Sequence, residues 1–234
     1  MSTATLKKSI GKSATANPKK RKLPAARAKI VKAQDRVHDN EDHDGKKPHP
    51  FPIEQHIIGG RSVASVSGET IPVIAPGDGN AFAEIASGTA EDIARAVSAA
   101  RRAFEGAWGR LTAIERGRLL LKLSQAVLDR AAELAALESR DTGKPISQGK
   151  ADVTALARYL EYYGSAADKL HGETIPFLNT HLVTILRVPH GVTGHIIPWN
   201  YPVQIFGRSV GAALAAGNAC VVKPAEDASL SILK

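Results

Sequence analysis

Cysteine is nearly absent from this 234-residue chain, which contains a single one, Cys220. One cysteine cannot form an intrachain disulfide, so we expect a reducing compartment and predict a cytoplasmic location. Long apolar runs are missing as well, because none approaches the ~20 residues of a membrane-spanning helix. We therefore expect no membrane association. The hydrophobic fraction of 43% is still enough to build a core.

Acidic residues are missing from the first 34 positions, which hold ten Lys/Arg. Residues 1–50 contain 13 Lys/Arg against 5 Asp/Glu, whereas residues 51–234 contain 18 of each, so the net charge of +8 belongs to the first segment. That segment has too few large apolar residues to offset its ordering entropy. We expect a disordered basic tail at 1–50, with weak, non-specific nucleic-acid contact, and a folded domain at 51–234.

Two ligand-binding motifs are also missing. His38, His43 and His49 are spaced as in no recognised metal motif, so we assign no metal site. The sequence has no G-x-G-x-x-G motif, and Gly191 with Gly194 is only a weak indication of dinucleotide binding.

A strand–helix–strand pattern is present between residues 191 and 227. Two short β-branched runs, at 195–197 and 219–222, are each bounded by Gly or Pro and predict buried parallel strands. The segment between them begins after Pro202, has apolar residues at near-helical spacing and ends at Gly217-Asn218. The pattern predicts a βαβ unit, in which ligands bind beyond the carboxyl ends of the strands.

Three amphipathic helices are predicted before this unit. The first starts at a capping-box pattern, Thr89 with Asp92, and the others cover residues 113–137 and 148–170. We expect the three helices to cover one face of the sheet, with Ile93, Val97 and Leu123 among their inward side chains.

Short β patterns flank these helices. Residues 55–85 predict a small meander of strands separated by glycine-containing turns. Residues 171–189 alternate and are rich in β-branched side chains, with a turn at Asn179-Thr180, so we predict a hairpin there.

Three short motifs carry a resemblance to a known family. They are Pro-Trp-Asn-Tyr-Pro at 198–202, Ala-Ala-Gly-Asn at 215–218 and Lys-Pro-Ala-Glu at 223–226. With these motifs, the chain from about residue 56 to 234 resembles the N-terminal portion of the NAD(P)-dependent aldehyde dehydrogenase superfamily. The resemblance implies an α/β fold with an incomplete Rossmann-type sheet and flanking helices. It also implies that the hairpin at 171–189 protrudes and joins subunits of a homo-oligomer.

The same resemblance implies a reaction and roles for individual residues. The family reaction is NAD-dependent oxidation of a small-molecule aldehyde to a carboxylic acid through a cysteine thioester. Asn200 matches the side-chain amide that donates to the developing oxyanion. Pro198, Trp199 and the backbone of Ile197 match walls of the cofactor pocket. Other interpretations stay open, because Asn200 is also a good turn residue and Trp199 also suits a core.

Lys223 and Glu226 match the residues that hold the adenosine ribose. A carboxylate accepts both ribose hydroxyls and repels a 2′-phosphate, which favours NAD over NADP. The alternative is an ordinary solvated Lys–Glu pair.

Cys220 does not fit the nucleophile of this reaction. It precedes Val221-Val222 in a predicted strand, where a thiol behaves as a small hydrophobe with a raised pKa. The resemblance places the nucleophile and the general base beyond Lys234, so we expect the 234 residues alone to be inactive. Arg208-Ser209 replaces a common Trp-Lys, which leaves the aldehyde unidentified. Two alternatives remain, a non-catalytic truncated gene product and a nucleic-acid-associated protein acting through its tail.

Overall fold

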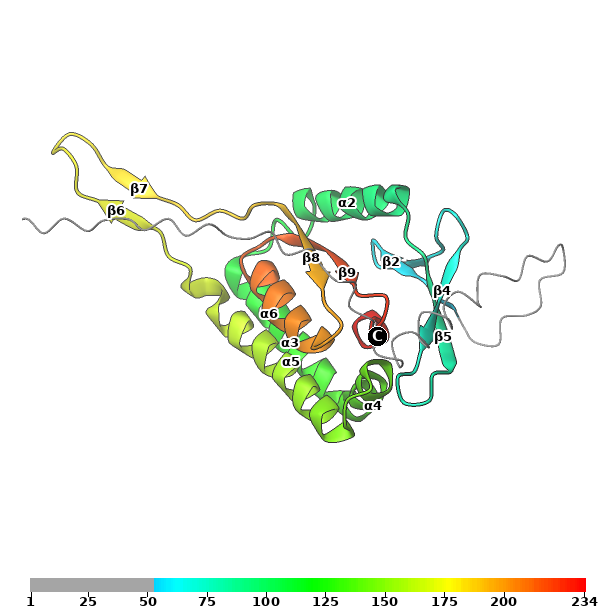
Figure 1. Cartoon of the computed structure of the whole chain (residues 1–234). Helices are drawn as coiled ribbons and strands as arrows, with labels where there is room; N and C mark the ends of the chain where they lie inside the picture. The colour runs from blue at the N-terminus through cyan, green and yellow to red at the C-terminus, as the bar shows by residue number, and fades with distance from the viewer. Residues whose placement is uncertain (1–52) are drawn as a thin grey trace, which may run out of the picture. The chain divides into compact units, whose positions relative to one another are not determined.

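The computed structural model describes residues 53–234 (Figure 1). The basic tail predicted at 1–50 and its three histidines lie outside the described residues, so the tail, its nucleic-acid contact and the domain boundary at residue 51 stay predictions. Within residues 53–234, no helix combines the length and the apolar character needed to cross a membrane.

The first strands form two small sheets rather than one meander. β1 (Ile53–Glu54), β5 (Ala81–Ala86) and β4 (Thr70–Ile74) lie in that order, with β1 parallel and β4 antiparallel to β5. β2 (His56–Ile58) and β3 (Arg61–Val63) pair separately. The predicted single meander is wrong because Gly59 and Gly60 adopt φ of 61° and 75° and close a two-residue hairpin.

Helix α2 (Ala90–Glu105) begins as predicted. The Thr89 hydroxyl accepts from the Asp92 backbone N–H, and the Asp92 carboxylate accepts from the Thr89 backbone N–H, which completes the capping box. The predicted inward face is only partly correct, because Ile93 and Val97 remain 47% and 39% exposed.

The predicted helix at 113–137 is two helices, α3 (Ala113–Asp129) and α4 (Ala131–Thr142). They meet at Arg130, whose φ of −107° and ψ of 15° depart from helical values. Leu134 is buried in the main core beside residues of α3, whereas Leu123, predicted to point inward, is 40% exposed. The apolar period continues through Arg130, so the break could not be predicted from the sequence.

The third predicted helix is confirmed as α5 (Ile146–Ala166), followed by the short 3₁₀ helix η1 (Ala167–Lys169). Its core side chains Val153, Leu156 and Leu160 are buried. They form the main hydrophobic cluster with side chains of α3, α4 and α6 (Pro202–Ala215).

The βαβ unit is confirmed as β8 (Val192–Ile197), α6 and β9 (Ala219–Pro224), with the strands parallel; the short helix α7 (Leu230–Leu233) follows. The strands are less buried than predicted, and Ile196 is 83% exposed. Side chains alternate between the two faces of a strand, and because His195 contacts Ser209 of α6, Ile196 points to the opposite face.

The helices form more than the single layer predicted. α6 packs against β8 and β9, and α3 and α5 pack against α6. α2 contacts the same two strands independently, and Figure 1 shows it on the other side of the strand pair from α6. The prediction that the three upstream helices cover one face is therefore wrong, because α3 and α5 form a second layer behind α6.

The predicted hairpin is confirmed. β6 (Glu173–Ile175) pairs antiparallel with β7 (Val183–Ile185), and the chain turns at 179–180. Figure 1 shows the hairpin extending away from the helices.

Candidate functional site

The two motif-bearing loops lie side by side at one edge of the β8–β9 pair. Ile197 is aligned with Pro224, the last residue of each strand, and the Ala225 N–H donates to the Ile197 carbonyl at 2.9 Å. Because the strands are parallel, the residues that follow them emerge at the same edge. The structure thus brings the 198–201 loop next to the loop after β9.

The 198–201 loop presents its side chains to solvent. Pro198, Trp199 and Asn200 are exposed, with Trp199 at 60%, so Trp199 is not a core residue. Pro202 then starts α6 at the first helical position, where the missing N–H has no cost. An exposed ring and an exposed amide are available to a ligand at the amino end of α6.

Ile197 differs from its neighbours in being almost fully enclosed. Its side chain is 1% exposed, so only its backbone could face a ligand. The carbonyl already accepts from Ala225 and keeps a second lone pair.

Lys223 and Glu226 form an exposed ion pair in the neighbouring loop. Lys223 Nζ lies 2.6 Å from Glu226 Oε2, and the two side chains are 52% and 57% exposed. The hydrogen bond from Lys223 lowers the pKa of Glu226, so the carboxylate is ionised at neutral pH. Such a pair contributes at most about 1 kcal/mol to stability, and its charges stay accessible to a ligand.

Cys220 lies near the start of β9, at the opposite end of the strand from the two loops. Burial raises the pKa of its thiol, and the Thr193 hydroxyl lies 3.6 Å from the sulfur. A thiol with a raised pKa is a poor nucleophile at neutral pH, which agrees with the sequence-based rejection of this residue.

Ser209, the residue that departs from the common Trp-Lys pattern, is held by the sheet. Its hydroxyl lies 2.5 Å from Nδ1 of His195, whose Nε2 lies 2.9 Å from the Thr193 hydroxyl. Burial lowers the pKa of His195, which favours the neutral ring.

Sequence reasoning missed a buried ion cluster beneath the 198–201 loop. Lys144 Nζ lies 2.9 Å from Glu138 Oε1 and 2.6 Å from Asp152 Oδ2, and both acids are fully buried. The same ammonium is 3.4 Å from the Asn200 carbonyl oxygen. These residues come from α4, α5, the corner between them and a distant loop, so no local spacing could reveal the cluster.

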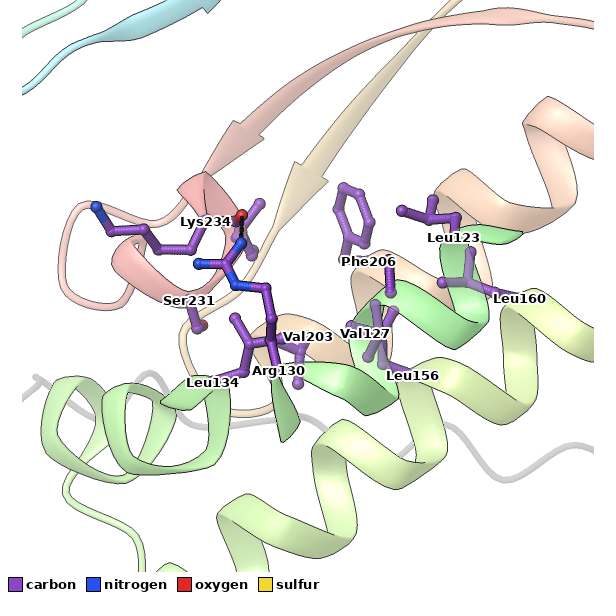
Figure 2. Close-up of a pocket in the computed structure, with 12 residues that line it drawn as sticks. Leu123, Val127, Arg130, Leu134, Leu156, Leu160, Val203, Phe206, Ser231 and Lys234 are labelled. Atoms are coloured by element: carbon purple, nitrogen blue, oxygen red, sulfur yellow. Dashed lines mark hydrogen bonds between the residues drawn. The ribbon is translucent and has the colours of Figure 1, made fainter. Parts of the chain in front are cut away.

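A cavity of about 200 Å³ lies elsewhere, between α3, α5, α6 and α7 (Figure 2). Its wall is mostly apolar and includes Leu123, Val127, Leu160 and Phe206. At its mouth Arg130 Nη1 donates to the Lys234 carbonyl at 2.8 Å, the bond drawn as a dashed line in Figure 2. The cavity has three polar lining residues, Arg130, Ser231 and Lys234, and contains none of the predicted site residues.

The part of the chain that the structure describes contains no group of three or more His, Cys, Asp or Glu side chains arranged to hold a metal ion.

The fold and this edge together define a class of protein. In open α/β proteins, ligands bind beyond the carboxyl ends of parallel strands, which is where this chain exposes a ring, an amide and a Lys–Glu pair. The model of the aldehyde dehydrogenase family matches residues 63–234. The chain belongs to this family, which confirms the resemblance and the fold class predicted from the sequence.

Individual relatives agree with that assignment. The mitochondrial benzaldehyde dehydrogenase of Antirrhinum majus is 44% identical over 190 residues, which are 80% of this chain and 36% of the relative. A solved structure of a Burkholderia cenocepacia protein assigned to the aldehyde dehydrogenases is 64% identical, with a TM-score of 0.76, over 76% of this chain and 38% of that one. The chain spans about a third of the length of the curated relatives it matches.

Both forms of the cofactor occur among the structural neighbours. PnpE, solved in complex with nicotinamide adenine dinucleotide, is 46% identical with a TM-score of 0.75, over 76% of this chain and 37% of PnpE. An E. coli enzyme described as NADP-dependent is 32% identical with a TM-score of 0.75, over 77% of this chain and 37% of that one.

Proposed function

We propose that this chain supplies the adenosine half of the cofactor site and the oxyanion donor for NAD-dependent oxidation of an aldehyde to a carboxylic acid. The observation that carries the proposal is the contact between Ile197 and Ala225, which brings the loop that contains Asn200 next to the loop that contains Lys223 and Glu226. Family membership supports the reaction class, and the aldehyde itself stays unassigned.

The cofactor is held, in this proposal, by groups at the ends of β8 and β9. The ionised Glu226 accepts from the ribose hydroxyls, and Lys223 exchanges part of its contact with Glu226 for the cofactor. A 2′-phosphate would meet the same carboxylate, so NAD is preferred over NADP. Pro198, Trp199 and the second lone pair of the Ile197 carbonyl form the adjoining wall.

Asn200 has a different task. Its amide supplies an N–H donor without a titrating charge, which suits an oxygen that becomes negative in the transition state. The loss of one such donor typically lowers the rate about 10²–10³-fold. Because Cys220 is the single cysteine and lies at the wrong end of β9, we propose that the 234 residues alone do not turn over aldehyde.

The hairpin is proposed to join subunits of a homo-oligomer. Its exposed apolar side chains lie on both strands and around the turn, and several are more than two-thirds exposed: Phe177, Leu182, Leu186 and Val188. Exposed apolar groups gathered on one projecting element mark a protein-contact surface. For location we keep the cytoplasm, on the single cysteine, and for the tail a weak nucleic-acid contact, on its charge.

A fluorescence titration tests the cofactor site. Trp108→Phe leaves Trp199 as the single tryptophan, so its emission reports on the 198–201 loop alone. We expect NAD to change that emission saturably, while a panel of aldehydes with NAD gives no NADH formation. An emission that NAD leaves unchanged would contradict the proposed site, and turnover abolished by Cys220→Ser would contradict the dismissal of that thiol.

A further inference from the structure

The loop between β8 and α6 has few contacts that could fix its conformation. Residues 198–200 lie beyond the last strand pairing, and α6 starts only at Pro202. Among the described residues, the polar contact recorded for this segment is the one from Lys144 Nζ to the Asn200 carbonyl, at 3.4 Å. The same ammonium lies 5.0 Å from the centre of the Tyr201 ring, within cation–π range.

The α4–α5 corner carries Lys144 to this position. α4 ends at Thr142, and Gly143 adopts the left-handed conformation with φ of 75°, where other residues are strained. Pro145 then precedes the first turn of α5. This sharp corner turns the Lys144 side chain inward, where it is 11% exposed.

The cluster around Lys144 is highly connected. Its three N–H donors face Glu138, Asp152 and the Asn200 carbonyl. The second oxygen of Asp152 accepts from Gln148 and from Gln204, at 2.6 and 2.7 Å. Since Gln204 lies in the first turn of α6, Asp152 holds the start of the helix while Lys144 holds the loop before it.

Stability alone does not account for such a cluster. Removing two carboxylates and an ammonium from water is costly, and apolar side chains of similar volume often stabilise a protein as well or better. What apolar side chains cannot do is hold a backbone carbonyl in one orientation. The charge of Lys144 does this at the residue whose amide orientation matters to the chemistry.

We propose that Lys144 is a positioning residue, which anchors the Asn200 carbonyl and Tyr201 and so fixes the direction of the Asn200 amide. This inference rests on the proposed function, because the direction of the Asn200 amide matters only if that amide donates to the oxyanion. An oxyanion donor must lie about 2.7–3.1 Å from the developing charge, so a mobile loop would lose most of its effect.

The test compares two variants of the full 234-residue chain that differ only at Lys144. The first is Glu138→Gln/Asp152→Asn, which keeps the lysine and gives its partners neutral amides. The second adds Lys144→Met, so no buried charge is left without a partner. Backbone ¹⁵N relaxation gives the order parameter at Trp199 and Asn200, and amide resonances of α5 monitor the core.

We expect both variants to keep an ordered α5. The loop order parameter should stay near 0.85 in the double variant and fall below about 0.6 in the triple variant. A loop that is equally ordered in both variants, or equally mobile in both, would overturn the proposal. If either variant fails to fold, Lys144→Arg in the unaltered background is compared with the unmodified chain instead. Its guanidinium keeps the charge that the acids need, but its planar fork cannot reproduce the compact ammonium contacts. A rigid loop in Lys144→Arg would also overturn the proposal.

These measurements need no cofactor. A loop released by loss of Lys144, in a chain that does not bind NAD, would support the anchor and contradict the proposed function. A rigid loop in the triple variant, in a chain that binds NAD, would contradict the anchor and support the proposed function.

Discussion

Two Lys–carboxylate pairs belong to neighbouring parts of the candidate site and differ almost entirely in their surroundings. In both, the lysine Nζ lies 2.6 Å from a carboxylate oxygen, Lys144 from Asp152 and Lys223 from Glu226. The first pair is 11% and 0% exposed, and the second is 52% and 57% exposed. Equal distances therefore do not mean equal roles.

The two pairs differ in whether water can solvate the charge that is left when one partner is removed. If one partner of the buried pair is removed, the other is left as an uncompensated charge that water cannot reach. If one partner of the exposed pair is removed, water solvates the other at little cost. The buried pair is suited to hold structure, and the exposed pair is suited to exchange its contact for a ligand.

The largest expected effect comes from breaking the buried pair. Lys144→Met alone leaves Glu138 and Asp152 without their cation and should lower the free energy of unfolding by about 3–5 kcal/mol. Urea unfolding followed by circular dichroism measures this change. Lys150→Met, the same substitution at an exposed position on α5, should stay within about 0.5 kcal/mol. Equal losses in the two variants would remove the distinction between buried and exposed lysines.

A smaller effect is expected from Asp141, another buried acid, whose protonation should make the stability of the protein depend on pH. Burial raises the pKa of Asp141 to about 7, and the charge of Glu138 adds to the shift. Oδ2 of Asp141 accepts a hydrogen bond from the Leu230 N–H at 2.8 Å, whereas Oδ1 of Asp141 has no partner within residues 53–234. The folded protein therefore favours the protonated carboxyl, whereas the unfolded chain ionises it near pH 4.

The sign of the pH dependence follows. The stability that Asp141 contributes is fully present below about pH 4 and is lost as the pH rises through about 7. Between pH 5 and 8, the melting temperature of the unmodified chain should fall by several degrees more than that of Asp141→Asn. Thermal melts at a series of pH values test this, with the exposed Asp129→Asn as the control. Parallel pH profiles for Asp141→Asn and the unmodified chain would contradict the assignment.

The exposed pair should show the smallest effect on stability. Lys223→Met removes an exposed ion pair and should change the free energy of unfolding by less than about 1 kcal/mol. Differential scanning calorimetry of this variant, beside Lys144→Met, places both pairs on one scale. A loss of several kcal/mol at Lys223 would mean that this pair holds structure and is not reserved for a ligand.

Local signals in the sequence were sufficient for much of the fold. The Thr89–Asp92 capping box, the turn at 179–180 and the Gly and Pro residues around the βαβ unit each act within a few residues, and all were confirmed. The parallel strands then bring their two following loops to one edge, so the neighbourhood of these two loops could be predicted as well.

Features that depend on distant partners could not be predicted. No residue near Arg130 indicates the break between α3 and α4, because the helical spacing of apolar residues continues through Arg130. From the sequence alone, Lys144 is an ordinary turn lysine, and only the fold brings it to Asn200, 56 positions away. The exposure of Ile196 likewise depends on what covers its face of the β8–β9 pair, which its own β-branched sequence does not show.

Calorimetric titration of NAD and NADP tests the central claim, that the exposed pair at the end of β9 binds the cofactor, most directly. The unmodified chain should bind NAD more tightly than NADP. Glu226→Gln should weaken NAD binding about 10-fold, through loss of charge-assisted hydrogen bonds, and should narrow the difference between the cofactors. Glu161→Gln, which breaks another exposed pair at three-residue spacing, with Arg158 on α5, should leave both affinities unchanged. If Glu226→Gln binds both cofactors as the unmodified chain does, the exposed pair is only a solvated ion pair and the assignment is contradicted.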